Sequence, residues 1–597
     1  MAPILLSLLT SQLALSLPAP SAPPTHAAIA TESKLCTHIG LNILKSSPLA
    51  TAADALVASV LCIGVVAPYH SGLGGGGFGL IRAPNGSYTA LDFRECAPAA
   101  AFEDMYQGNV QGSITSGLAS GVPGEPAGLA WIHDHFGGLP WKDVVRPAVA
   151  LARDGFAVGA DLARYMASAV GSGRDFLSED PSWAIDFAPN GTRLGVGDWI
   201  TRRRYADLLQ AVGERGVRAF YEGPIAEATI ATIQAHNGSM TMEDLKEYAV
   251  IERKPATVEY RGQKLTSVGA PSGGVVAMAI MNIVGGYEGF GDPEEVNLTT
   301  HRLDEAMRFA YGMRTNLGDP SFVENLASYE SGMISPATGA DVRSRITEQT
   351  HNISYYNPGG FAELPTPGTS HLVATDSSGL TITLTTTVNL LFGSQLIVPE
   401  TGLVLNNEMN DFSIPGTSNA FGYIPSPANY IRPRKRPQSS ISPVIAEYPD
   451  GRMYVATGAA GGSRITTATV QNLIHILDGG MDVAEALAQP RLHDQLVPDN
   501  AVFEWGVAPG LPGYDNATVA SMKARGHNVT WVAPGLSSAH AVRVLPNGTM
   551  EAAGEPRGGE WGGMEWMEAD GGLRVLVGLG FAELVVGVEC LSCTFIH

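Results

Sequence analysis

The sequence predicts an α+β protein in which helices and β-sheets stack in layers. Segments 203–223, 223–238 and 301–314 carry apolar residues every three to four positions, which is typical of amphipathic helices. Segment 370–389 changes to two-residue alternation rich in β-branched residues, which is typical of two strands joined by a tight turn. Helices and strands follow one another without a strict βαβ rhythm, so we expect stacked layers of helix and sheet.

The composition indicates a large folded protein that does not bind nucleic acid. The chain has 597 residues, of which 45% are hydrophobic, and this is enough to bury a large core. Lys and Arg number 37 against 58 Asp and Glu, giving a net charge of -21 at pH 7. Affinity for a phosphate backbone comes mainly from Lys and Arg, so this balance argues against nucleic acid as a partner. We interpret the short basic runs at 202–204 and 432–437 as solvated surface.

Residues 1–20 predict a signal peptide. Their apolar run, 4–17, has the length of a signal-peptide core and is shorter than the roughly 20 residues that a spanning helix needs. Glycosylation sequons agree with entry into the secretory pathway. They lie at Asn85, Asn190, Asn237, Asn297, Asn352, Asn516, Asn528 and Asn547. We expect an extracellular, cell-surface or vacuolar protein, with the leader either removed or retained as an anchor.

The cysteines leave several pairings open. Cys36 and Cys62 lie on either side of a helical stretch, and an oxidising compartment would let them pair. Cys590 and Cys593 lie in the C-terminal tail, and Cys96 is left over. Neither the cysteines nor the histidines fall into a zinc-binding spacing, so we expect no metal and no cofactor.

Two glycine-rich turns are flanked by regular structure. A helix predicted over 47–67 precedes four glycines at 74–77. This run lacks the Gly-Lys-Ser/Thr ending or the βαβ context of a phosphate-binding loop, so we predict close backbone packing. Segment 453–480 reads as strand, glycine turn and helix, because Val470, Leu473, Ile474 and Leu477 share one helical face.

The loop before residue 370 ends in Gly368 and Thr369, which raises the possibility of a cut between them. A threonine hydroxyl is a weak nucleophile unless a base lies beside it, and an N-terminal residue can use its own α-amino group. Attack of the Thr369 hydroxyl on the Gly368 carbonyl turns the peptide into an ester that water opens. The freed amine has a pKa of about 7.7 to 8.0. Taken alone, a threonine at the start of a strand is usually structural.

Several motifs, in the same order, resemble the γ-glutamyltranspeptidase family over residues 35 to 562. They are GLGGGGFGL with LDFRECAP, GTSHLVATDSSGLTITLTTTVNLLFGS, TGLVLNNEMNDFS, RPQSSISP, GAAGGSRITTATV and ALAQPRLHDQL. The resemblance implies a four-layer αββα sandwich of the N-terminal nucleophile hydrolase type, formed jointly by a large and a small subunit from one precursor. It implies a large subunit at 35–368 and a small catalytic subunit at 369–562. The signal peptide expected at 1–20 precedes them, and residues 563–597, which match no part of the family, form an extension of unknown role.

The same resemblance assigns the catalytic roles. Thr369 is the implied nucleophile and Thr387 the residue that positions it. Gly461 and Gly462 are the implied oxyanion hole, in agreement with their place at the start of a helix, where the dipole favours negative charge. Without the resemblance, this turn would read as an ordinary tight turn.

Substrate recognition follows from the charges of a γ-glutamyl group. Its α-carboxylate calls for a guanidinium and hydroxyls, and its α-ammonium calls for carboxylates. By resemblance, the carboxylate is bound by Arg94, Ser439 and Ser440. The amine is bound by Asn389, Glu408 and Asp411.

Two further details come from the same resemblance. It pairs Cys36 with Cys62 in a disulfide of the large subunit. It also shows a departure, because Asn410 stands where the family commonly has an aspartate. We expect a small effect, since the neighbouring Asp411 matches the binding residue.

The implied reaction is acyl transfer from glutathione or a related γ-glutamyl compound to water or to an amino acid or peptide acceptor. One alternative is a cephalosporin acylase specificity on the same scaffold. The charged residues at Arg94, Ser439 and Ser440 argue against it, because a substrate without an α-amino acid head would leave them unmatched. The other alternative is an uncut secreted binding protein, and the complete set of catalytic motifs argues against that.

Overall fold

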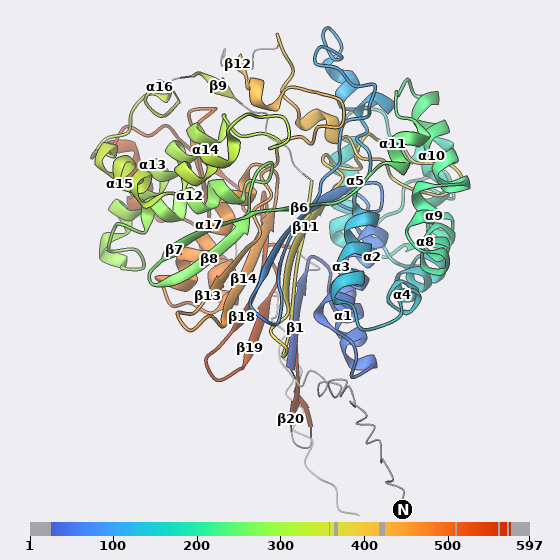
Figure 1. The fold of residues 1–597 in the computed structure, drawn as a ribbon, viewed down its shortest axis with the longest axis horizontal. Coiled ribbons are helices and arrows are strands. Elements are labelled where there is room, and N and C mark those ends of the chain that lie inside the picture. The colour runs from blue at the N-terminus through green and yellow to red at the C-terminus, as the bar shows by residue number, and fades with distance from the viewer. Residues whose placement is uncertain are drawn as a thin grey trace, which may run out of the picture.

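The computed structural model describes residues 26–357, 359–362, 368–416, 424–507, 510–558, 562–569 and 572–574. Two β-sheets lie face to face between two layers of helices (Figure 1). This confirms the expected αββα sandwich. The expected signal peptide, Cys590, Cys593 and most of the proline-containing loop before Gly368 lie outside the described residues.

The first sheet contains the predicted hairpin at its centre. Its order is β21 (Gly572–Arg574), β20 (Gly562–Ala569), β1 (His26–Thr31), β10 (Ser370–Asp376), β11 (Thr381–Thr387), β2 (Gly76–Arg82), β3 (Tyr88–Phe93) and β6 (Ile251–Arg253). Every residue of β10 and β11 is buried, because helices cover one face of the sheet and the second sheet covers the other. The alternation in 370–389 therefore correctly predicted strands, and both faces of these strands are covered.

The second sheet also mixes early and late parts of the chain. Its order is β19 (Met550–Ala553), β18 (Ser538–Val544), β14 (Met453–Ala460), β13 (Val444–Glu447), β8 (Gln263–Val268) and β7 (Pro255–Tyr260). Strands from both sides of position 368 thus contribute to each sheet. Short strands outside the two sheets are β4 (Phe156–Ala157), β5 (Trp199–Ile200), β9 (Phe361–Ala362), β12 (Ile424–Pro425), β15 (Leu492–His493), β16 (Ala501–Glu504) and β17 (Val529–Val532).

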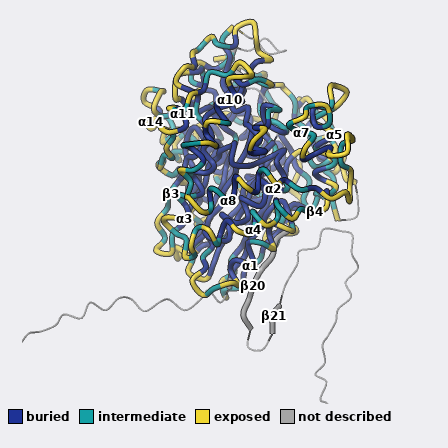
Figure 2. The backbone as a smooth tube through the Cα atoms, turned by 90° about the vertical axis from the view of Figure 1, so that its right-hand side faces the viewer, coloured by how far each residue is buried: buried dark blue, intermediate teal, exposed yellow. Residues whose placement is uncertain are grey.

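One helical layer covers the outer face of the first sheet. It contains α1 (Lys34–Ser46), α2 (Ala52–Val66), α3 (Glu125–Phe136), α4 (Trp141–Asp154), α5 (Ala160–Val170), α6 (Phe176–Glu179), α7 (Pro181–Phe187), α8 (Arg203–Arg215), α9 (Arg218–Tyr221), α10 (Pro224–Ala235) and α11 (Met242–Lys246). Figure 2 looks onto this layer, where the outer turns and loops are exposed and the interior is buried.

The other helical layer covers the second sheet. It contains α12 (Gly274–Val284), α13 (Val296–Arg314), α14 (Leu326–Met333), α15 (Pro336–Arg345), α16 (Ile353–Tyr356), α17 (Arg464–Leu477), α18 (Val483–Ala488) and α19 (Asn516–Ala524). The segments predicted as helical at 223–238 and 301–314 correspond to α10 and α13, and the helix predicted within 453–480 is α17. The segment predicted at 203–223 is divided, because α8 ends at Arg215 and α9 begins at Arg218. Among the described residues, no helix combines the length and apolarity needed to cross a bilayer.

A disulfide joins the first two helices. Cys36 and Cys62 have their Cα atoms 5.4 Å apart, so the expected pairing is present. Their placement differs from the sequence-based interpretation, because each lies within a helix of its own, α1 and α2 respectively. The first helix ends just before Pro48, because a proline disfavours helical geometry in the residue that precedes it.

The glycine run packs directly against neighbouring backbone, as predicted. A Cβ atom would lie 2.0 Å from a carbonyl oxygen at Gly74, Gly75 and Gly77. For Gly75 that oxygen belongs to Thr387, the last residue of β11. The absence of side chains therefore lets β2 lie close to the strand that carries Thr387.

The C-terminal segment begins as part of the first sheet. Strand β20 starts at Gly562 and pairs along its length with β1, from His26↔Met567 to Thr31↔Gly562. The boundary expected at 562/563 therefore falls inside a strand.

Candidate active site

The two sheets bring the start of β10 and the end of β14 to the same edge of the sandwich. At the opposite edge, Arg82 of β2 donates from Nε to Glu447 of β13 at 2.7 Å. Near the site, a Cβ atom on Gly458 would lie 2.3 Å from the ring of His371. Thr369 lies two residues before His371, and Gly461 lies three residues after Gly458. Both therefore lie at the same end of the two strands.

The hydroxyl of Thr387 links the two residues of the expected cut. Its Oγ1 donates to the carbonyl oxygen of Gly368 at 2.6 Å and accepts from the backbone amide of Asn389 at 2.8 Å. The hydroxyl of Thr369 lies 3.5 Å from the same Oγ1. Thr369 and Thr387 are both buried, so this carbonyl is polarised in a site with little water.

Gly368 occupies a position that only glycine fits. Its φ angle is +128°, which side-chain-bearing residues rarely adopt. A Cβ atom there would lie 2.2 Å from the carbonyl oxygen of Asn389. Contacts with the segment after β11 therefore hold the peptide before Thr369 in a conformation that would be strained for any other residue.

Gly461 and Gly462 form the turn between β14 and α17. Both have positive φ angles, +118° and +62°. A Cβ atom on Gly461 would lie 2.5 Å from the carbonyl oxygen of Leu536. The amides of Arg464 and Ile465 donate back to the carbonyl oxygens of Gly461 and Gly462. The turn therefore lies at the N-terminus of α17, where the helix dipole favours negative charge.

A buried charged cluster lies beside the hydroxyl groups. Arg94 follows β3, and its Nη1 lies 2.5 Å from Oε1 of Glu408. Its Nη2 pairs with the carboxylate of Asp411 and donates to the carbonyl of Gln438 at 3.2 Å. Glu408 and Asp411 come from one short 3₁₀ turn, Glu408–Asp411, so the turn places both acids on one guanidinium.

The remaining expected residues are connected to this cluster. Asn389 donates from Nδ2 to the carbonyl of Asn407, the residue before Glu408, at 2.9 Å. Ser439 follows Gln438, and its Oγ accepts from the amide of Ile441 at 3.2 Å. The hydroxyl of Ser440 accepts from Nη2 of Arg314 at 3.3 Å. A continuous series of contacts thus runs from Thr369 through Asn389 to Arg94 and on to the serines.

The structure pairs charges that the sequence-based interpretation assigned to opposite ends of a bound substrate. Arg94 was expected to bind the α-carboxylate of the substrate, and Glu408 and Asp411 its α-ammonium. In this structure, Arg94 contacts both acids. Neighbouring Glu95 is also fully buried, and burial raises its pKa to about 8. Burial also raises the pKa of Glu408 well above its usual range. The cluster therefore holds more acidic groups than Arg94 can balance.

Sequence reasoning missed two residues of this site. Glu95 was visible beside Arg94 in the LDFRECAP motif, but nothing in the motif indicated its burial. Arg314 lies at the end of α13, 126 positions before Ser440, and no local pattern connected the two.

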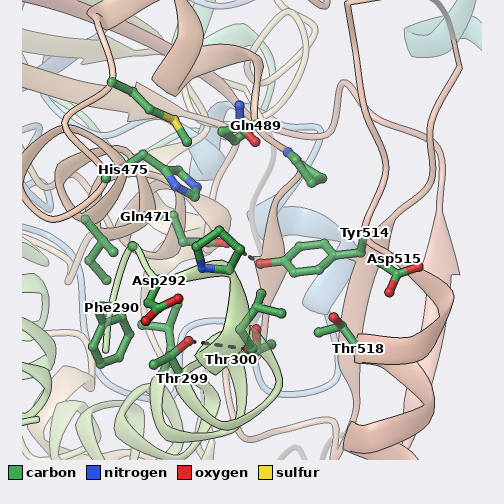
Figure 3. Close-up of a pocket in the computed structure, with 18 of the residues that line it drawn as sticks. Phe290, Asp292, Thr299, Thr300, Gln471, His475, Gln489, Tyr514, Asp515 and Thr518 are labelled. Carbon is green, nitrogen blue, oxygen red and sulfur yellow. Dashed lines mark hydrogen bonds between the residues drawn. The ribbon is translucent and has the colours of Figure 1, made fainter. Parts of the chain in front are cut away.

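A separate cavity of about 390 Å³ lies between α13, α17 and residues that precede and include the start of α19 (Figure 3). Gln471, His475 and Tyr514 are among its lining residues. His475 lies near the end of α17, while Gly462 precedes its start, and the rise along such a helix is roughly 20 Å. This cavity is therefore distinct from the candidate active site.

The αββα layers, with a buried threonine opening a central strand, place this protein among the N-terminal nucleophile hydrolases. The chain belongs to the gamma-glutamyltranspeptidase family, whose sequence model matches residues 36–563. It is 50% identical over 549 residues to a glutathione hydrolase proenzyme of Arthroderma benhamiae, covering 90% of this chain and 92% of the relative. It is 45% identical over 533 residues to a glutathione hydrolase of Aspergillus flavus, covering 89% and 88%.

Solved structures agree on the fold. A cephalosporin acylase from Bacillus halodurans superimposes with a TM-score of 0.77 at 24% identity, covering 92% of this chain and 98% of that one. At that identity the match establishes the fold alone. A γ-glutamyltranspeptidase from Helicobacter pylori gives a TM-score of 0.51 at 29% identity, covering 59% of this chain and 97% of that one.

Proposed function

We propose that this protein is a γ-glutamyltranspeptidase that cleaves itself between Gly368 and Thr369 and then hydrolyses or transfers the γ-glutamyl group of glutathione. The observation that carries the proposal is the position of the Thr387 hydroxyl, 2.6 Å from the Gly368 carbonyl oxygen and beside the Thr369 hydroxyl. The Thr369 hydroxyl is the nucleophile first in the self-cleavage and later in the hydrolysis.

In the cut, the Thr369 hydroxyl attacks the carbonyl carbon of Gly368. The developing negative charge on that carbonyl oxygen is met by the hydrogen bond that Thr387 already donates. The C–N bond breaks, the nitrogen takes a proton to become the α-amine of Thr369, and water hydrolyses the ester. The proposed fragments, 35–368 and 369–562, remain associated because both sheets contain strands from each.

In turnover, the new α-amine accepts the proton of the Thr369 hydroxyl as it attacks the γ-carbonyl of the substrate. The amides of the Gly461–Gly462 turn stabilise the oxyanion, and the amine of Cys-Gly leaves with a proton. Water or the amine of an amino acid or peptide then attacks the γ-glutamyl ester. Either acceptor regenerates the free hydroxyl of Thr369.

Recognition of the substrate is proposed to be an exchange of ion pairs. Without substrate, Arg94 pairs with Glu408 and Asp411. The α-carboxylate of a γ-glutamyl group would take its place on Arg94, together with Ser439 and Ser440. The α-ammonium would pair with Glu408 and Asp411 and donate to the side-chain oxygen of Asn389. A zwitterion exchanges these partners without adding net charge to the cluster, which a singly charged acyl group cannot do.

The disulfide and the glycosylation sequons support a proposal for the cellular location. A disulfide between Cys36 and Cys62 fits an oxidising compartment, and the sequons fit passage through the secretory pathway. We infer an extracellular, cell-surface or vacuolar enzyme.

Three p-nitroanilides test the specificity directly. The γ-glutamyl compound has both charges, the glutaryl compound lacks only the amine, and the 4-aminobutyryl compound lacks only the carboxylate. We expect kcat/KM to fall by at least about 100-fold for each truncated compound, because buried polar groups would lose their partners. Equal turnover of the glutaryl compound would instead favour an acylase of the cephalosporin type.

A further inference from the structure

Three buried side chains meet between α13 and the turn that follows α19. His301 and Glu305 lie one helical turn apart on α13, and His527 follows α19. One ligand atom from each of them lies within 4.8 Å of the others. The closest pair is Nδ1 of His301 and Nε2 of His527, 2.8 Å apart. None of these residues belongs to the catalytic or substrate-binding set described above.

The outer nitrogens of both rings face acceptors. Nε2 of His301 lies 2.8 Å from the carbonyl oxygen of Thr347, which cannot donate, so the hydrogen of this ring is on Nε2. Nδ1 of His527 lies 2.9 Å from Oδ2 of Asp304. When Asp304 is ionised it can only accept, and the hydrogen of this ring is then on Nδ1. Each neutral ring then turns a lone pair toward the other.

The surrounding charges favour a cation at this point. The Tyr356 hydroxyl donates to the Glu305 carboxylate, at 2.7 and 2.8 Å from its two oxygens, and so orients it. Nη1 of Arg308 is paired with Asp494 at 2.9 Å and with Asp499 at 2.8 Å. Asp304 and Glu305 are both fully buried and add two further carboxylates to this group. A divalent cation would compensate these two carboxylates when they are ionised.

We propose that Nδ1 of His301, Nε2 of His527 and the carboxylate of Glu305 bind a divalent transition-metal ion, with zinc the best match to this set of ligands. Thr347 and Asp304 would hold the outer ring nitrogens, as acceptors commonly do behind metal-binding histidines. Zinc–nitrogen bonds of 2.0–2.1 Å place two such nitrogens roughly 3.3 Å apart in a tetrahedral site. The rings therefore separate by roughly 0.5 Å when the ion enters.

The ion would join two parts of the chain that are distant in sequence. His301 and Glu305 precede position 368 and His527 follows it, so the metal would link the large and small fragments. This consequence rests on the cut proposed above, whereas the site itself does not. The competing arrangement is a direct hydrogen bond between the two rings, which requires Asp304 to hold a proton.

Zinc binding by the full-length protein tests the proposal. The protein is stripped with a chelator, exchanged into metal-free buffer, and titrated with zinc chloride in a calorimeter. Its zinc content is then measured after desalting. We expect one zinc ion per chain and a melting temperature that rises with zinc concentration, because a ligand that binds only the folded state stabilises it.

Matched variants assign the binding to these residues. His301→Gln and His527→Gln keep a group that can hydrogen-bond but remove the imidazole, and each should weaken zinc binding by more than about 100-fold. Asp304→Asn should weaken it by about 10- to 100-fold. His135→Ala is the control, since this exposed histidine lies on α3, and it should bind zinc like the wild type. Thr369→Ala should also bind zinc, which separates this site from the proposed cut.

Two results would overturn the proposal. One is a wild-type protein that takes up no stoichiometric zinc and shows no zinc-dependent melting temperature, which would favour the direct hydrogen bond between the rings. The other is unchanged zinc affinity in the His301→Gln/His527→Gln double variant. If that variant does not fold, the stoichiometry and melting curves of the wild type still decide the question.

Discussion

The nucleophile side and the recognition side of the candidate active site are built on different physical principles. Around Gly368, Thr369 and Thr387 the groups are hydroxyls, carbonyls and amides, and no charged side chain contributes to the hydrogen bonds described there. Around Arg94 the groups are buried charges, with Glu408 and Asp411 on one guanidinium. The first side depends on backbone position and the second on charge balance.

This difference determines how each side should respond to substitution. A misplaced atom on the nucleophile side stops the chemistry, because the reacting hydroxyl and carbonyl must be aligned. A removed charge on the recognition side leaves another charge buried without a partner, which affects stability as well as binding.

The largest effect is expected for Thr369→Ala. Without the hydroxyl there is neither a cut nor a covalent intermediate, so the protein should remain a single chain on a denaturing gel. It should show no turnover of γ-glutamyl-p-nitroanilide. Thr369→Ser is the control, since it keeps the hydroxyl and should still be cut. Normal processing of Thr369→Ala would refute the role given to this residue.

Gly368→Ala should slow the cut, although it keeps both the reacting carbonyl and the Thr369 hydroxyl. The added Cβ meets the Asn389 carbonyl at 2.2 Å on a backbone with positive φ. Strain of about 1–3 kcal/mol corresponds to a cut roughly 5- to 150-fold slower. The time course of fragment appearance measures this, with Gly360→Ala as a control because that glycine has positive φ but open space around it. Equal rates in both variants would exclude steric control at Gly368.

On the recognition side, Arg94→Ala and Arg94→Lys should differ. The alanine variant leaves Glu408 and Asp411 without a cation and should lose about 3–5 kcal/mol of unfolding free energy. The lysine variant keeps the charge but loses the planar fork, so its kcat/KM should fall by about 100-fold while most of the stability remains. Urea unfolding and steady-state kinetics measure the two quantities. A lysine variant within about twofold of wild type in kcat/KM would exclude carboxylate binding by the fork.

The smallest effect on turnover is expected for Glu95→Gln, which should instead change the pH dependence of stability. Burial raises the pKa of Glu95 from its ordinary 4.5 to about 8, so the folded protein holds this proton more tightly than the unfolded chain. The resulting stabilisation is complete below pH 4.5 and is lost as the pH rises through 8. The variant should therefore gain stability relative to wild type between about pH 5 and about pH 8.5. Parallel stability curves over this range would contradict the burial argument.

The sequence predicted the parts of this molecule that depend on local pattern. Alternation gave β10 and β11, helical periodicity gave α17, and the absence of a lysine after the glycine run correctly indicated backbone packing at Gly75. The family resemblance supplied the four-layer αββα order, because the position of strands from both chain halves in each sheet has no local signature.

The contacts that the sequence could not predict join distant segments. Arg94 and Asp411 are 317 positions apart, so their ion pair could not be inferred from spacing. His301 and His527 are 226 positions apart and match no zinc-binding spacing, which is why the expectation of no metal did not consider them. The strand at the start of the C-terminal segment was missed as well, because its partner, β1, lies at the other end of the chain.

Whether Thr369 becomes a new N-terminus is decided by N-terminal sequencing of the purified, active protein after separation on a denaturing gel. We expect two fragments, the smaller of which begins Thr-Ser-His-Leu, at Thr369. Active protein that is continuous through position 369, or a small fragment that begins at another residue, would contradict it.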